Sequence, residues 1–180
     1  MKNRIVFVAF VCIDLRVGAA APDSPKEVLN FKIGDDWKVI ANSETGHGHS
    51  VTYARDADAG NPWKERVAYL YGARKRGLQA PEKEFRVLEA DTEKRWPGLT
   101  EWKAISQDEN SILYEWHIQW SASTHEEWNI SRIIHTKHSW FTLMYTARAP
   151  ELAPETRTQW IKTFSDATVV AADSAAITAR

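Results

Sequence analysis

The chain has 180 residues, with 23 basic and 24 acidic side chains and a formal net charge of −1. This length fits one domain preceded by a short processing segment, without room for a second core. A hydrophobic fraction of 43% and a charged fraction of 26% argue against a disordered chain and against a bundle of membrane helices. The charge balance also indicates no nucleic-acid partner, because such binding needs a concentrated basic surface.

The first 20 residues have the layout of a secretion signal. Lys2 and Arg4 precede an apolar run, 5–13, and small residues follow at 18–21. The apolar run is too short to span a membrane, which takes about 20 residues. We therefore predict that residues 1–20 are a cleaved signal peptide. The mature protein is expected to be periplasmic or secreted, with no membrane span after cleavage.

Cleavage after Ala20 removes Cys12, the only cysteine, so the mature chain is expected to hold no disulfide and no cysteine–zinc site. Two prolines within residues 21–28 indicate a flexible tether. We expect a single domain over 29–170 and a frayed, alanine-rich tail over 171–180.

Residues 112–120 are the most informative stretch, because large apolar side chains alternate there with polar ones. Successive side chains of a strand point to opposite faces, so this pattern predicts a strand with one apolar face. Only Leu113 breaks the alternation. We predict the central strand of a sheet that buries one face. Its apolar residues are Ile112, Tyr114, Trp116, Ile118 and Trp120.

Alternation and helical periodicity predict the remaining elements. Prolines open two expected helices, at 81–96 and from Pro154 onward. Residues 66–73 fit either a strand or a helix, and we favour the strand because Tyr69 and Tyr71 suit a sheet. Further strands are expected at 31–33, 37–39, 49–55, 102–105, 128–135, 140–147 and 168–170.

These elements predict an α+β domain in which a single antiparallel sheet, a meander plus N-terminal hairpins, packs against two helices. Their order over 28–170 resembles the PsbP-like fold, and the local patterns that carry the resemblance are at 31–37, 139–146 and 160–164. The resemblance implies a binding or accessory role, as in bacterial envelope proteins of the DcrB type. It supplies no catalytic residue.

A histidine pair is the sharpest local motif. His47 and His49 flank a glycine, with Glu44 upstream, and two imidazoles at this spacing can hold zinc or copper if a third ligand is supplied. We considered His117 or Asp56 as that ligand. The alternative is a plain glycine-rich loop that happens to contain histidines.

The polar side of the strand at 112–120 is the surface that we expect to bind a partner. We assigned both helices to the apolar side, through Phe85, Leu88, Trp160, Ile161 and Phe164. That assignment leaves the polar side open to a protein or glycan. The expected binding residues are Glu115, His117, Gln119, Asn129 and Trp140.

Taken together, the sequence predicts an exported, non-enzymatic binding or accessory protein of the bacterial envelope whose partner is another protein. A metal-binding protein using His47 and His49 is the first alternative. A hydrolase with a non-standard site is the second, since the sequence has no Gly-x-Ser-x-Gly elbow and no phosphate-binding glycine loop.

Overall fold

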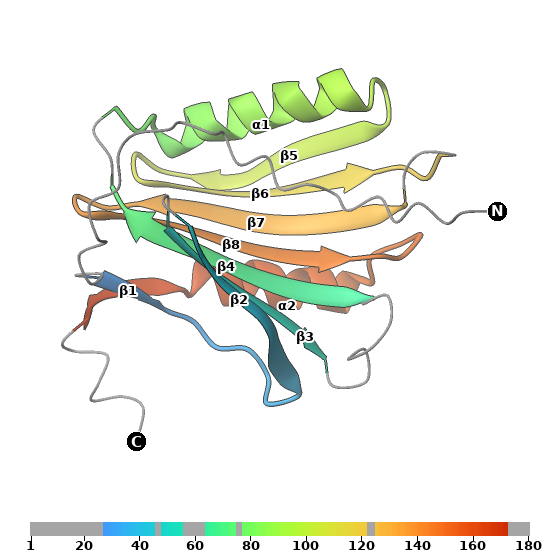
Figure 1. The fold of residues 1–180 in the computed structure, drawn as a ribbon. Helices are drawn as coiled ribbons and strands as arrows, with labels where there is room; N and C mark the ends of the chain where they lie inside the picture. The colour runs from blue at the N-terminus through green and yellow to red at the C-terminus, as the bar shows by residue number, and fades with distance from the viewer. Residues whose placement is uncertain (1–26, 46–47, 56–63, 75–76, 122–124, 173–180) are drawn as a thin grey trace.

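The computed structural model describes residues 27–45, 48–55, 64–74, 77–121 and 125–172. The predicted signal peptide, most of the predicted tether and residues 173–180 of the predicted tail lie outside this range. The described residues form an α+β domain with two helices and mostly antiparallel strands, as the sequence predicts (Figure 1). None of the described helices is long and apolar enough to cross a membrane.

The strands form two sheets, so the prediction of a single sheet is wrong. Seven strands make one antiparallel sheet in the order β2-β3-β4-β8-β7-β6-β5. A separate pair joins β1 (Glu27–Asn30), which begins inside the predicted tether, to β9 (Thr168–Ala171). Residues 31–33, predicted as a strand, form the connection that follows β1. The seven strands are β2 (Trp37–Thr45), β3 (Gly48–Arg55), β4 (Glu65–Ala73), β5 (Thr100–Gln107), β6 (Ser111–Ile118), β7 (Glu127–His135) and β8 (Ser139–Ala147).

Both helices begin and end where the local sequence requires. α1 (Pro81–Arg95) and α2 (Pro154–Ser165) each open with a proline, which lacks the amide hydrogen that the first turn cannot use. Acidic side chains in the first turn and basic ones in the last turn favour the helix dipole. Both predicted helices are therefore confirmed.

β4 settles the ambiguous stretch at 66–73, which is a strand, as favoured. It lies between β3 and β8, where Tyr69 stands opposite Val51 on one side and Leu143 on the other. The neighbouring strands β3 and β8 thus take up the backbone hydrogen bonds that a helix would have satisfied internally.

The two helices pack on opposite faces of the seven-stranded sheet, which corrects the prediction that both cover one face. Phe85 of α1 packs on Ile112 and Tyr114, whereas Trp160 and Phe164 of α2 belong to the cluster on the other face. We call these the α1 face and the α2 face. Figure 1 shows α1 along the β5 side and α2 behind the sheet.

Leu113 explains why the one-faced prediction failed. It is 2% exposed and packs in the cluster on the α2 face, while its neighbours Ile112 and Tyr114 are buried on the α1 face. A strand covered on both faces carries apolar residues at successive positions. The single break in alternation was therefore the signal for a second covering helix.

The core on the α2 face is centred on Trp160. Its ring stacks on Tyr145 at a centroid distance of 4.6 Å and meets the edge of Trp37 at 5.5 Å. Aromatic side chains bury about 150–250 Å² each, so this group supplies much of the apolar burial that fixes α2.

We predict that Gly48→Ala destabilises the domain by about 2–5 kcal/mol, because it adds backbone strain to a steric clash. Gly48 has φ of +149°, and a Cβ placed there would lie 2.3 Å from the carbonyl oxygen of Tyr71. Urea unfolding measures the loss. Gly77→Ala is the matched control, since its φ is +84° but the space around it is open, and it should cost only about 1–2 kcal/mol. Equal losses for the two variants would contradict the clash.

Candidate binding face

The register of β6 against β7 divides the predicted binding surface between the two faces. Glu115 stands opposite Ile130, on the α2 face, whereas Asn129 stands opposite Trp116, on the α1 face. Trp140 pairs with His135 and also lies on the α1 face. The predicted residues therefore do not form one surface. The sequence could not show this division, because alternation within each strand does not give the register between strands.

Glu115 anchors α2 and is not an open surface group. Its carboxylate accepts hydrogen bonds from Arg157 Nε at 2.6 Å and from Arg157 Nη2 at 2.9 Å, and its side chain is only 13% exposed. Bidentate pairs of this geometry are among the stronger hydrogen-bonded contacts in proteins. The carboxylate raises the pKa of Arg157 through these hydrogen bonds.

His117 is also covered. Its ring stacks on Trp128 at 3.9 Å, and its Nε2 lies 2.9 Å from a carboxylate oxygen of Glu126. Gln119 lies beyond the end of β6 and is exposed, and its backbone N–H donates a hydrogen bond to the carbonyl oxygen of Leu99. The prediction of an uncovered polar side is therefore wrong for the part of this surface that lies on β6.

Of the two candidates for the third metal ligand, the structure excludes His117. His49 lies on β3, stacked on Tyr71 at 4.8 Å and 3.6 Å from Glu44. His117 lies on β6, four strands away in the sheet, or about 19 Å at the usual strand spacing. His47 and Asp56 lie outside the described residues, so a zinc or copper site there stays a prediction. Within the described ranges, no three His, Cys, Asp or Glu residues form a group that could hold a metal.

The α1 face carries a cluster of buried polar side chains that was not predicted as a group from the sequence. Five polar side chains of β7 and β8 lie there with exposures of 4% or less, His135 among them, and we call the other four the polar row. The Thr146 hydroxyl donates to Asn129 Oδ1 at 2.7 Å, and the Asn129 amide lies 3.4 Å from a Glu127 carboxylate oxygen. The polar row consists of Glu127, Asn129, Ser131 and Thr146.

Two arginines flank the polar row. Arg148 Nε lies 3.8 Å from a carboxylate oxygen of Glu127, and Arg66 stands opposite Thr146 on β4. Burial lowers the pKa of Arg66, and the nearby Glu127 charge opposes that shift. Ionised groups are costly to bury unless they are paired and hydrogen-bonded. Burying this cluster within the sheet therefore costs free energy that apolar side chains at the same positions would not cost.

The helix that gives the α1 face its name covers only part of it. α1 packs on β5, β6 and β7, and Glu84 reaches His135 at 3.3 Å. Over β8, β4 and β3, none of the main contacts between described elements places a helix or a strand of another layer on this face. Ala54 and Ala68 are nevertheless only 1% exposed there. The α1 face is thus the side of the sheet that carries the polar row, and α1 covers only its β5, β6 and β7 part.

Ser131 and His135 also bear on the hydrolase alternative. They lie four residues apart on β7, a separation of about 13 Å along a strand, which is too far for a serine to be activated by a histidine. The Ser131 hydroxyl is fully buried beside Tyr114, which stands opposite it on β6. These two residues therefore give the hydrolase alternative no support.

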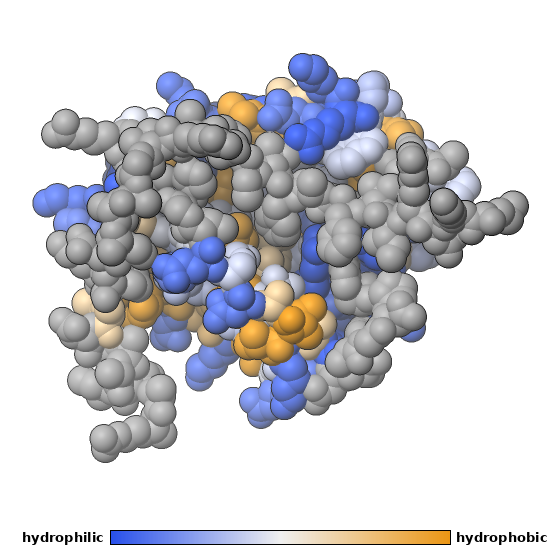
Figure 2. Space-filling view, in the orientation of Figure 1, coloured by the Kyte–Doolittle hydropathy of each residue, from blue (hydrophilic) through white to orange (hydrophobic). Residues whose placement is uncertain are grey.

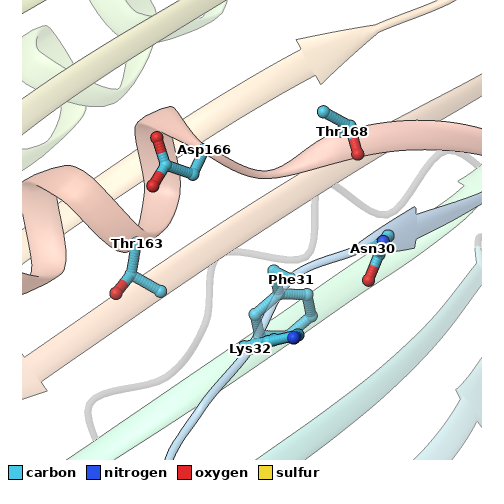
Figure 3. A pocket seen from close by; sticks show the side chains of 6 residues that line it. All are labelled: Asn30, Phe31, Lys32, Thr163, Asp166 and Thr168. Carbon is cyan, nitrogen blue, oxygen red and sulfur yellow. The ribbon is translucent and has the colours of Figure 1, made fainter.

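Two other surface features are less suited to a site. A hollow of 290 Å³ lies between the end of β1, the last turn of α2 and the start of β9 (Figure 3). Its carboxylate, Asp166, forms an ion pair with Lys162 at 2.6 Å. The hollow is lined by Asn30, Phe31, Lys32, Thr163, Asp166 and Thr168. The second feature is a group of hydrophobic residues in the region of β2, where Val39 and Ile40 are 56% and 46% exposed (Figure 2).

Comparison with known proteins identifies similar solved structures but no family. No protein-family model matches the chain, and no curated protein matches it. Among solved structures, the chain is similar to LpqN of Mycobacterium tuberculosis, described as involved in cell envelope biogenesis. The identity is 18% and the TM-score is 0.47, with 82% of this chain and 86% of that chain covered.

We predict that Glu115 and Arg157 are coupled by about 1–2 kcal/mol, because both charges are partly desolvated and their contact is bidentate. Urea unfolding of Glu115→Gln, Arg157→Gln and the double variant measures this energy as a double-mutant cycle. The pair Lys162 and Asp166 is the control, since both side chains are well exposed, and its coupling should stay below about 0.5 kcal/mol. Similar coupling in the two pairs would contradict the anchoring role of Glu115.

Proposed function

We propose that this protein is an exported accessory protein of the bacterial envelope that binds another protein with the α1 face over β7, β8, β4 and β3. The observation that carries the proposal is the polar row, a set of buried polar and charged groups on a sheet face that α1 covers only in part. Burial of such groups costs free energy that an apolar core would not incur, so a role beyond packing accounts for them better.

The composition of the two faces supports this assignment. On the α2 face, Leu143, Tyr145 and Ile130 pack under α2 as an ordinary apolar core. On the α1 face, the corresponding positions of the same strands carry Asn129, Thr146 and other polar groups. If cover alone were needed, apolar residues of similar volume would stabilise the sheet as well or better. Polar groups at these positions are better explained by recognition.

Export and fold family are further parts of the proposal. The layout of residues 1–20 supports secretion. The order of elements, with four strands before α1, a meander after it and α2 near the end, is in keeping with a PsbP-like fold. Proteins with this fold serve in binding and accessory roles, which agrees with a partner protein rather than a small substrate.

We predict that Thr52→Arg weakens capture of the partner from envelope extracts by roughly tenfold, because a bulky cation would stand on the binding face. Thr52 is half-buried on β3, opposite Ala68 on the α1 face. The measurement is a pull-down with the exported chain, followed by titration of the captured protein.

Val39→Arg is the matched control. It adds the same side chain to the neighbouring strand at a position that is 56% exposed, and it should leave capture unchanged. Equal capture by both variants, with a partner present, would place the binding surface elsewhere. Turnover of a captured substrate would refute the non-enzymatic role.

A further inference from the structure

β5 forms one edge of the seven-stranded sheet. It is the last strand in the sheet order, and among the described strands it pairs only with β6. An edge strand presents a row of backbone N–H and C=O groups that can pair with a strand of another chain. The opposite edge strand, β2, is less suited to such pairing, because a bulge between Val39 and Ala41 interrupts it.

The regular part of β5 is symmetric about Trp102. The ladder with β6 is unbroken from Thr100 to Ala104 and then shifts between Ala104 and Ser106. Trp102 is the middle residue of this five-residue segment. When two such segments pair antiparallel in register, Trp102 stands opposite Trp102 of the second copy and Thr100 stands opposite Ala104. The pairing has a twofold axis, as the interface of a symmetric dimer requires.

The charges of β5 are complementary in that register. Glu101 and Lys103 flank Trp102, and both are exposed. They lie on the α2 face with Glu115, which stands opposite Lys103 on β6. In the symmetric pairing, the glutamate of each copy faces the lysine of the other, which gives two cross-strand pairs of opposite charge.

The same charges disfavour the neighbouring registers. A slip of two residues in one direction places Lys103 opposite Lys103 of the second copy, and a slip in the other direction places Glu101 opposite Glu101. Like charges directly opposite each other destabilise a strand pair. A lysine on an edge strand also discourages pairing with unrelated strands. The edge is therefore complementary to a second copy of itself in a single register.

α1 leaves room for a second copy at this edge. The helix packs on β5, β6 and β7, and its Phe85 packs on Ile112 and Tyr114 of β6. These contacts place the helix over β6, inward of the edge. In the paired sheet the two copies of β6 are three strand spacings apart, or about 14 Å. Packed helices need only about 8–10 Å between their axes, so the two copies of α1 fit side by side.

We propose that this protein forms a twofold-symmetric dimer in which β5 pairs antiparallel with β5 of a second copy about Trp102. The two seven-stranded sheets then become one continuous sheet. Its twofold axis is perpendicular to the sheet, so both α1 faces lie on the same side. A partner with two matching surfaces would gain avidity from this arrangement. That consequence rests on the proposed function, whereas the dimer itself forms without a partner protein.

Charge reversal on the exported chain tests the register. Glu101→Lys places lysine opposite lysine in the dimer, and Lys103→Glu places glutamate opposite glutamate. Each variant alone should raise the dimer dissociation constant by roughly tenfold, as measured by sedimentation velocity over a range of protein concentrations. In an equimolar mixture of the two variants, both cross-strand pairs are again of opposite charge. The mixture should therefore dimerise to within about threefold of the unchanged protein.

Lys38→Glu and Glu44→Lys are the matched controls, because they reverse the same charges on β2, the opposite edge strand. Both should leave the dissociation constant unchanged. An unchanged protein that stays monomeric up to about 100 µM would overturn the proposal. Dimerisation that survives both reversals on β5, or that the mixture does not recover, would overturn it as well.

Cysteine pairing gives a second measurement, which needs no new negative charge at Lys103, 3.6 Å from Glu115. The only cysteine of the full chain lies in the predicted signal peptide, so Glu101→Cys and Lys103→Cys each give the exported chain a single thiol. Opposite residues of an antiparallel pair lie about 4.5–5.5 Å apart between Cα atoms, which a disulfide can bridge. Under mild oxidation, a mixture of the two variants should form linked dimers roughly ten times faster than either variant alone. Equal rates would contradict the register.

Discussion

The requirement that β6 and β7 bury both of their faces organises this structure. These strands are interior strands of a seven-stranded sheet, with α1 on one side and α2 on the other. Leu113 and Tyr114, adjacent in sequence, are buried in separate clusters. Because the sheet has two covered faces, each strand residue belongs to one of two different environments, and register decides which residues share an environment.

The two environments differ in what holds them together. The α2 face is fixed by aromatic packing around Trp160 and by the ion pair between Glu115 and Arg157. The α1 face combines an aromatic cluster under α1 with the polar row beyond it. Apolar packing is insensitive to the orientation of a partner, whereas buried hydrogen-bonding groups demand matching donors and acceptors. The α1 face is therefore better suited to specific recognition than the α2 face.

Much of the fold could be predicted from the sequence. Both helices and the meander follow from proline positions and local periodicity, since these signals arise within about ten residues. The strand at 66–73 was favoured over a helix by its two tyrosines. The pairing of β1 with β9 could not be predicted in this way. It joins Glu27 to Ala171, and a four-residue strand carries no pattern that identifies a partner so distant in the chain.

The sequence by itself determined which side chains of β6 and β7 alternate, and hence that Glu115 and His117 share a face. Only the tertiary structure decided that Asn129 and Trp140 lie on the other face and that α2 covers Glu115. Alternation is a property of one strand, fixed by backbone geometry. The register between strands and the side on which a helix packs depend on the whole core, because they are set by contacts among residues far apart in the chain.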